Sequence, residues 1–221
     1  MRSRHDPARI GVILYDTVEP IDLGGTVGVI SMARRILPNL ADAVIARQAG
    51  PVALAGGLTV MAPYGVADAP DCDAYIVCGG AGWPEASKDE TLIDFLKRQP
   101  PGKLASVCTG ALVLAASGAL DGRTVTTRRN TAGSEARAPI ERLAEVARGS
   151  SAVVAAVADD VVVTGGGVSL AIDATLYLVG KLYGEGLRDD VARLIEYDRA
   201  FEANRTGLGH VMGGSKAAAL L

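Results

Sequence analysis

An α/β domain with a mostly parallel central sheet is the fold that the sequence predicts. Short apolar runs rich in Val, Ile and Ala alternate with helix-like segments, a pattern typical of strands buried on both faces. The 221 residues are enough for one well-buried domain and few for two. Because no repeat, linker or change in composition divides the chain, we expect residues 1–221 to form a single domain with its core over about residues 9–200.

Strands are expected where a short apolar run is bounded by turn residues. In chain order these runs are Arg9–Tyr15, Ala41–Arg47, Pro51–Met61, Ala74–Cys78, Lys103–Val107, Arg123–Thr127, Ala152–Ala158 and Val161–Thr164. Gly56-Gly57 predicts a hairpin turn within the third run, and Asp159-Asp160 predicts a turn before the last.

Helices are expected between these strands. The predicted segments are Asp22–Leu37, Asp89–Arg98, Thr109–Ser117, Ser169–Tyr183 and Leu187–Tyr197. Pro38-Asn39 would end the first helix and Gly118 the third, while the second is amphipathic. Beyond Arg205 the chain is rich in Gly, Ala and Ser, so a frayed tail is expected over residues 206–221.

Composition argues against nucleic acid and membranes as partners. The net charge is −3 and aromatic residues make up only 4% of the chain, so basic surface and stacking rings are both scarce. Leu104–Leu120 has no charged residue, but polar residues and glycines interrupt it and its length is marginal for a membrane span. A buried strand followed by a buried helix explains this stretch better.

Cysteine usage and the amino terminus indicate a cytoplasmic protein. Three cysteines without metal-ligand spacing predict a reducing compartment and no zinc site. Met1–Arg9 is polar and precedes only a short apolar run, so we expect no secretory signal.

Cys108 is the candidate nucleophile. It lies between a predicted strand and a predicted helix, where a tight turn would lift its side chain from the carboxyl edge of the sheet. The helix amino terminus would favour the thiolate, and the small residues of Thr109-Gly110-Ala111 would let a substrate approach. The alternative is a small buried side chain without a chemical role, which is what we expect for Cys72 and Cys78.

A carboxyl group is the expected partner of this thiol. The chain has only two histidines, His5 and His210, and both fall in segments expected to fray. Asp22 follows the first predicted strand, and an apolar environment would raise its pKa and let it donate a proton. Its alternative role is that of a helix N-cap.

The run Gly79-Gly80-Ala81-Gly82 follows a strand but does not fit a dinucleotide-binding fingerprint. Its glycines have the wrong spacing, Pro84 is expected to prevent a following helix, and the strand is not the first. Exposed N–H groups of this loop, at Gly80 and Gly82, would instead form an oxyanion hole or anion nest. Gly165-Gly166-Gly167 admits the same role, although close strand–helix packing explains it better.

Several motifs occur together in an order that resembles the ThiJ/PfpI superfamily of class I glutamine amidotransferase-like proteins, in its isonitrile hydratase-like branch. The motifs are Ile21–Gly25, Val77–Gly82, Val107–Leu114, Gly122–Thr127, Gly167–Asp173 and Ile195–Asp198. Related domains also serve as sensors in AraC-type regulators. The resemblance spans nearly the whole predicted domain.

The resemblance implies a flavodoxin-like three-layer sandwich with a nucleophile elbow, a homodimer and no cofactor. It implies that Cys108 attacks the isonitrile carbon, that Asp22 and Thr109 assist, and that water releases an N-substituted formamide from a thioimidate. For the oxyanion or substrate-binding part of the site we expect Gly80, Gly82, Trp83 and Thr127. Trp83 is equally compatible with packing, and Tyr64 is a further candidate for the pocket.

One position departs from the family pattern. A histidine commonly follows the Thr-Thr pair, whereas here Arg128-Arg129-Asn130 follows Thr127. The change favours either a Cys–Asp mechanism without histidine or a different, anionic substrate. The alternative is that Arg128 is an ordinary surface charge.

Two other functions remain open. A glyoxalase or deglycase acting on α-oxoaldehydes would use the same elbow, but with a glutamate and commonly a histidine. A ligand sensor would bind without turnover. Regulators with this domain carry DNA-binding helix-turn-helix units after it, whereas this chain ends soon after the last predicted helix, so a stand-alone regulator is not expected.

Overall fold

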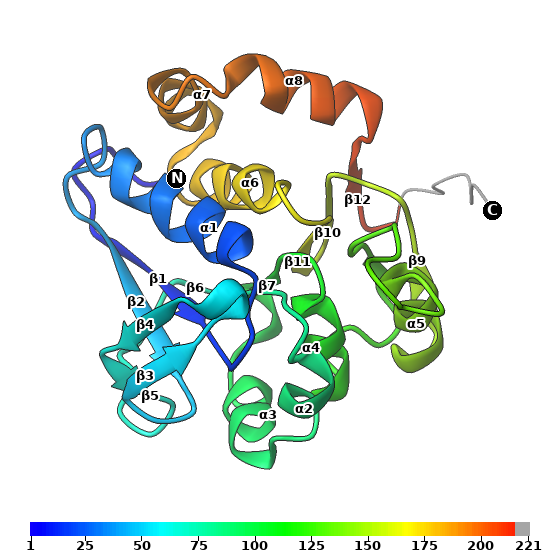
Figure 1. The fold of residues 1–221 in the computed structure, drawn as a ribbon. Helices are drawn as coiled ribbons and strands as arrows, with labels where there is room; N and C mark the ends of the chain where they lie inside the picture. The colour runs from blue at the N-terminus through cyan, green and yellow to red at the C-terminus, as the bar shows by residue number, and fades with distance from the viewer. Residues whose placement is uncertain (215–221) are drawn as a thin grey trace.

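The computed structural model describes residues 1–214 and has one eight-stranded sheet at its centre (Figure 1). All neighbouring strands of this sheet are parallel except β10 and β11, which form an antiparallel hairpin. From one edge to the other the strands are β12 (His210–Met212), β10 (Val157–Asp160), β11 (Val162–Gly165), β7 (Leu104–Ser106), β6 (Ala74–Val77), β1 (Ala8–Ile13), β2 (Leu40–Ala46) and β5 (Tyr64–Gly65). The predicted α/β fold with a mostly parallel sheet is confirmed.

Helices cover both faces of the sheet and complete the expected three layers. One face carries α1 (Pro20–Ala33), α6 (Ala171–Tyr183), α7 (Glu185–Leu194) and α8 (Asp198–Gly207). The other face carries α2 (Trp83–Ala86), α3 (Glu90–Lys97), α4 (Gly110–Ala116) and α5 (Pro139–Val146). Each face has its own cluster of buried aliphatic side chains, because strands buried on both sides need an apolar layer above and below.

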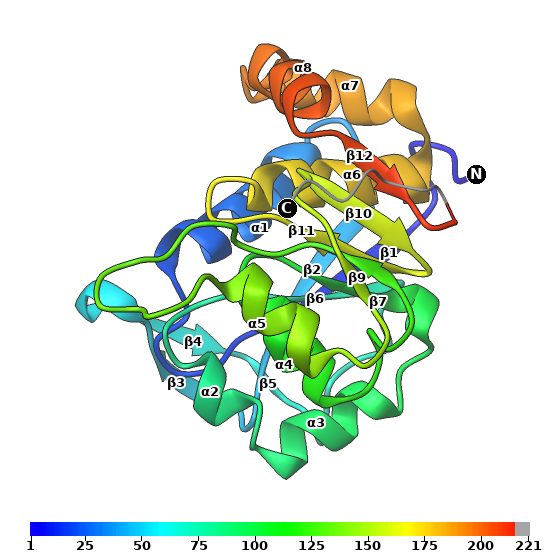
Figure 2. The ribbon, with the colours of Figure 1, turned by 90° about the vertical axis from the view of Figure 1, so that its right-hand side faces the viewer.

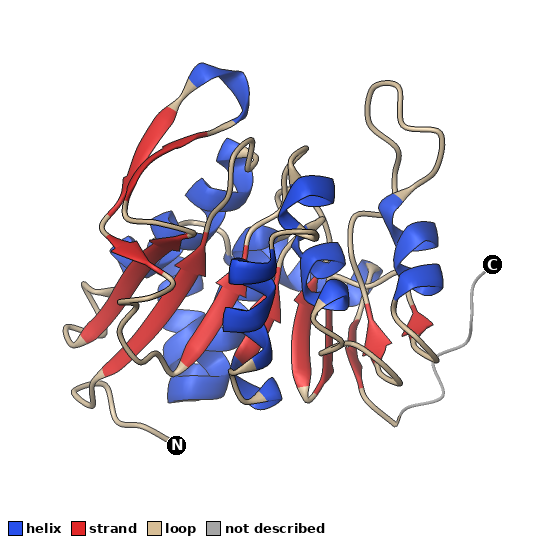
Figure 3. Cartoon of the chain, turned by 90° about the horizontal axis from the view of Figure 1, so that it is seen from below, coloured by secondary structure: helices blue, strands red, loops and turns tan. Residues whose placement is uncertain are grey.

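Short two-stranded pieces lie outside the main sheet. β3 (Gly50–Ala53) and β4 (Thr59–Ala62) form the predicted hairpin, which extends away from the sheet (Figure 3). Gly56 and Gly57, at φ +72° and +82°, turn the chain between them, a backbone region that glycine adopts readily. β8 (Thr124–Val125) pairs with β9 (Ser151–Ala152), and short 3-10 turns cover Ala55–Gly57 and Pro101–Lys103.

The predicted turn at Asp159-Asp160 is wrong, because both residues belong to β10. The turn of this hairpin is at Val161, whose φ is +66°. Asp159 is stable in a strand because Lys181 Nζ lies 2.7 Å from its Oδ2 and the Tyr177 hydroxyl donates to the same oxygen at 2.9 Å.

The carboxyl-terminal segment contains two elements that the sequence did not predict. The prediction of a frayed tail is wrong for residues 206–214. α8 continues to Gly207, and β12 then pairs in parallel with β10 (Figure 2). His210 therefore lies in an edge strand, packed edge-on against Tyr177 and Phe201. Residues 215–221 of that predicted tail lie outside the described residues.

Among the helices that the structure describes, none has both the length and the apolar character needed to cross a bilayer.

Candidate active site

The expected nucleophile elbow is present at Cys108. β7 ends at Ser106, α4 begins at Gly110, and Cys108 between them has φ +50°, a backbone conformation that L residues rarely adopt. Two hydrogen bonds hold this geometry: the Cys108 N–H donates to Gly166 O at 2.9 Å, and the Thr127 hydroxyl donates to Cys108 O at 2.6 Å. The side chain is buried, with only 3% of the residue exposed.

Asp22 lies opposite the thiol, in the first turn of α1. Its Oδ2 accepts the Gly79 N–H at 2.8 Å, while Oδ1 is buried and has no hydrogen-bond partner within residues 1–214. A methyl group added at Gly79 would lie 2.7 Å from both Asp22 Oδ2 and Cys108 Cβ, so the two side chains meet over this glycine. The N-cap role is excluded, because Glu19 occupies the cap position and Asp22 is inside the helix.

The carboxyl and the thiol both retain their protons at neutral pH. Burial raises the pKa of Asp22 to about 8, against the opposing effect of the Gly79 N–H. Burial, and then the nearby Asp22 charge, raise the pKa of Cys108 to about 12. The Thr109 N–H and Arg128 act in the opposite direction but do not outweigh burial. The raised pKa expected for Asp22 is therefore present, whereas the depressed pKa expected for the thiol is not.

Thr109 holds the glycine loop against the elbow. Its hydroxyl accepts the Gly80 N–H at 2.8 Å and faces Gly80 O at 3.2 Å. Gly80 N–H is thus already bonded within the protein, which does not fit its expected role as a free oxyanion donor. Gly82 packs so closely on the backbone after β1 that a side chain there would collide with Asp16 O. The loop is glycine-rich because it is packed tightly.

Trp83 begins α2 and packs against the α4 face of the sheet, with the Arg142 guanidinium 6.0 Å from its ring centroid. It does not line the cavity beside the elbow, so the packing alternative holds. The expectation that Pro84 prevents a following helix is wrong, because Pro84 occupies the first turn of α2, where a missing N–H does no harm. Tyr64 lies in β5, the strand at the edge of the sheet farthest from β12, and it does not line the cavity beside the elbow.

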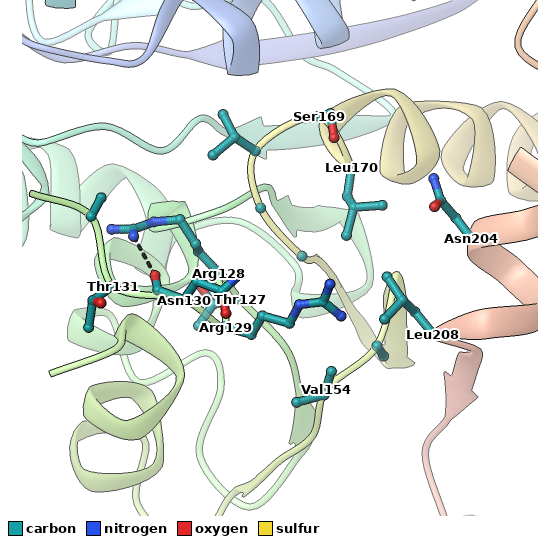
Figure 4. Close-up of a pocket in the computed structure, with 15 residues that line it drawn as sticks. Thr127, Arg128, Arg129, Asn130, Thr131, Val154, Ser169, Leu170, Asn204 and Leu208 are labelled. Atoms are coloured by element: carbon teal, nitrogen blue, oxygen red, sulfur yellow. Dashed lines mark hydrogen bonds between the residues drawn. The ribbon is translucent and has the colours of Figure 1, made fainter. Parts of the chain in front are cut away.

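Arg128 belongs to the site and is not an ordinary surface charge. Only 13% of its side chain is exposed, and its guanidinium faces the Cys108 thiol. Nη2 lies 2.6 Å from Glu135 Oε1, and Nη1 donates to Asn130 O (Figure 4). Arg128 can occupy this position because residue 167 is a glycine. A side chain on Gly167 would lie 2.6 Å from Arg128 Cβ and would collide with it.

Tyr15 is a site residue that the sequence did not single out. Its hydroxyl is buried without a hydrogen-bond partner in the part of the chain described. Burial, reinforced by Cys78, Asp22 and Cys108, raises its pKa well above the usual value, so it remains a neutral donor. Its position at the end of the first predicted strand was the available signal, because carboxyl ends of parallel strands converge on one edge.

A cavity of about 390 Å³ adjoins the elbow (Figure 4). Thr127 and Gly166, which bond the Cys108 backbone, form part of its wall, so the cavity lies beside the elbow. The full lining is Thr127–Ala132, Val154, Ala155, Gly166–Leu170, Asn204 and Leu208. Within residues 1–214, no group of three or more His, Cys, Asp or Glu side chains is placed to hold a metal ion.

The chain belongs to the DJ-1/PfpI family, whose model matches residues 8–179. It is 30% identical to the isonitrile hydratase of Pseudomonas putida over 194 residues, which is 86% of this chain and 78% of the hydratase. It is also 27% identical to the HTH-type transcriptional regulator GbdR of Pseudomonas aeruginosa over 96% of this chain, which spans 57% of the regulator. The resemblance to the ThiJ/PfpI superfamily is thereby confirmed.

Solved structures agree with the fold. A ThiJ/PfpI family protein from Pseudomonas syringae superposes with a TM-score of 0.74 at 24% identity, covering 88% of this chain and 76% of that one. Drosophila melanogaster DJ-1beta gives a TM-score of 0.71 at 18% identity, covering 86% and 98%. The flavodoxin-like three-layer sandwich is therefore the fold of this protein.

Proposed function

We propose that this protein is a cofactor-free lyase that hydrates isonitriles to N-substituted formamides through Cys108. The observation that carries the proposal is the buried pair at the elbow, a thiol facing a carboxyl that is still protonated near neutral pH. The similarity to an isonitrile hydratase over most of both chains supports it.

The first half of the reaction needs a proton and a nucleophile at one atom. The terminal carbon of an isonitrile carries a lone pair, so it is protonated first and attacked second. Asp22 gives its proton to this carbon, the Cys108 sulfur forms a bond to the same carbon, and the thiol proton returns to the Asp22 carboxylate. The product is a thioimidate, S–CH=N–R, whose C–H hydrogen is the proton given by Asp22.

The second half consumes one water molecule. Water adds to the thioimidate carbon while Asp22 orients it, and the nitrogen gains a proton. The tetrahedral intermediate then expels sulfur, which takes back a proton as the Cys108 thiol. The sum is R–NC plus water giving R–NH–CHO. Asp22 Oδ1 and the Tyr15 hydroxyl, both buried without a hydrogen-bond partner in the described residues, are the atoms to which we assign this water.

Turnover of cyclohexyl isocyanide tests the proposal, with N-cyclohexylformamide measured by chromatography. Cys108→Ala should abolish the activity, and Asp22→Asn should lower kcat/KM by roughly 100-fold or more, the range expected for loss of a general acid. Cys72→Ala, which changes another buried cysteine, is the matched control and should remain active. Undiminished turnover by Cys108→Ala would end the proposal.

A ligand sensor is the second candidate, favoured by the similarity to GbdR over nearly the whole chain. A sensor would bind a small molecule in the same cavity without converting it. Parallel assays with cyclohexyl isocyanide and methylglyoxal separate the candidates. The hydratase converts the first, a glyoxalase or deglycase the second, and a sensor neither.

A further inference from the structure

Two adjacent arginines contribute to the cavity beside the elbow, and they differ in how their charge is balanced. Arg128 is ion-paired with Glu135, whereas Arg129 is exposed and forms no ion pair with any residue that the structure describes. Figure 4 shows the two side chains diverging, with Arg129 extending toward Leu208. No aspartate or glutamate lines the cavity, although the chain as a whole has a net charge of −3. The cavity therefore offers one uncompensated positive charge.

The wall around Arg129 is largely apolar. Val154, Leu170 and Leu208 surround the space into which its side chain extends, and Asn204 from α8 adds an amide at the rim (Figure 4). A volume of about 390 Å³ lies within the range of small-molecule sites. Aliphatic side chains next to a free guanidinium suit a ligand with a short hydrocarbon chain that ends in a carboxylate.

The position of the cavity connects this charge to the reaction. Thr127 and Gly166 belong both to the wall of the cavity and to the hydrogen bonds that fix Cys108. Arg128 lines the cavity and also faces the thiol. A ligand in the cavity thus lies beside the elbow, between Arg128, which faces the thiol, and Arg129.

We propose that Arg129 favours substrates that carry a carboxylate, so that this site prefers isonitriles of aliphatic acids to uncharged ones. The inference rests on the proposed function for the isonitrile group, but the carboxylate subsite is a property of the cavity itself. Binding at the cavity needs no turnover and is measured separately.

Calorimetric titration with a matched pair of product analogues tests the subsite. 6-Formamidohexanoate carries the carboxylate, and 6-formamidohexanamide has the same length without charge. The native protein should bind the acid at least tenfold more tightly than the amide. Arg129→Gln should remove this preference, because no other unpaired cation lines the described cavity. Arg98→Gln, at an exposed arginine outside the cavity, should keep it.

Equal affinity for the acid and the amide, binding of neither, or an unchanged preference in Arg129→Gln would each overturn the subsite. Tight, Arg129-dependent binding of the acid without turnover of any isonitrile would instead overturn the proposed function and leave the subsite standing. Turnover of cyclohexyl isocyanide without any preference for the acid would overturn the subsite and leave the proposed function standing.

Discussion

Asp22 and Asp173 are both fully buried carboxyls whose pKa values burial raises, but they differ in their hydrogen bonds. Asp22 accepts one backbone N–H, and burial raises its pKa to about 8. Asp173 accepts from the Tyr197 hydroxyl at 2.9 Å and from the Asn204 amide at 3.1 Å, and burial raises its pKa only to about 6. Donors stabilise the charged form, so the carboxyl with fewer donors is the one suited to act as an acid.

The activity should depend on the proton of Asp22. Because the pKa of this carboxyl is about 8, kcat/KM for isonitrile hydration should be constant below that pH and fall as the pH rises through it. Initial rates between pH 5 and pH 10 measure the profile. Asp22→Asn should lose this inflection along with most of the activity, whereas a profile that rises through pH 8 would contradict an acid role.

Asp22→Asn should also stabilise the fold at neutral pH. Between about pH 4 and pH 8 the folded protein keeps a proton on Asp22 that the unfolded chain releases, so the free energy of unfolding falls as the pH rises. The asparagine variant avoids this loss. At pH 7 it should be more stable by on the order of 2–4 kcal/mol.

Urea unfolding of both proteins at pH 4 and pH 7 measures this difference. The gap between variant and native protein should be small at pH 4 and larger at pH 7. Unfolding free energies that change in parallel with pH would show that the Asp22 pKa is not raised by folding.

At the residue scale, the sequence was sufficient to predict where two candidate site residues lie. Cys108 and Asp22 each follow a predicted strand, and their side chains meet over Gly79, next to the Thr109 N–H. The thiol pKa could not be predicted in this way, because it depends on burial by layers distant in sequence. The involvement of Arg128 likewise depends on Glu135 and on the backbone at Gly167.

At the scale of elements, α8 is held to the rest of the molecule by Asp173 of α6. This carboxylate accepts hydrogen bonds from Tyr197 and Asn204, at either end of a segment that carries one buried apolar residue, Phe201. Because α8 has so little apolar surface in the core, its position depends on polar bonds. Asn204 and Leu208 of this region also line the cavity, so the same bonds shape the candidate binding site.

Asp173→Ala should therefore destabilise the protein by about 1–3 kcal/mol, since it removes the buried acceptor of two half-buried donors. Asp173→Asn keeps one acceptor oxygen and should lose less. Thermal unfolding together with amide hydrogen exchange over α8 measures both effects. Equal stability of the alanine variant and the native protein would mean that these bonds do not hold α8.

The missed elements have a common physical reason. α8 has one buried apolar residue and β12 has none that is fully buried, so neither shows the hydrophobic periodicity that predicts secondary structure. β12 forms because β10 offers an open edge with which it pairs. The central strands and α6 were predictable, because segments that are buried in the core consist largely of apolar residues.

At the scale of the whole molecule, the strand order assembles the site. β1, β6 and β7 are neighbours in the sheet, and they end just before Tyr15, Gly79 and Cys108 respectively. Parallel strands bring these ends to one edge, where α/β proteins place their ligand sites.

We expect two copies of the chain to associate, as the family resemblance implies. Leu58 and Met61, on the β3–β4 hairpin, are 55% and 66% exposed, and burying them against a second copy would remove apolar surface from water. Light scattering should give twice the mass of one chain for the native protein. The double variant Leu58→Glu, Met61→Glu should be monomeric, while Val146→Glu on α5 should remain dimeric. A monomeric native protein would contradict the expectation.

The covalent intermediate is the most direct test of the central claim that Cys108 attacks the isonitrile carbon. Rapid mixing with cyclohexyl isocyanide, followed by mass spectrometry of the intact protein, should show a gain equal to one isonitrile molecule. That gain should appear before formamide accumulates and should be absent from Cys108→Ala. Formamide production without any adduct on the native protein, and with Cys108→Ala still active, would contradict the account.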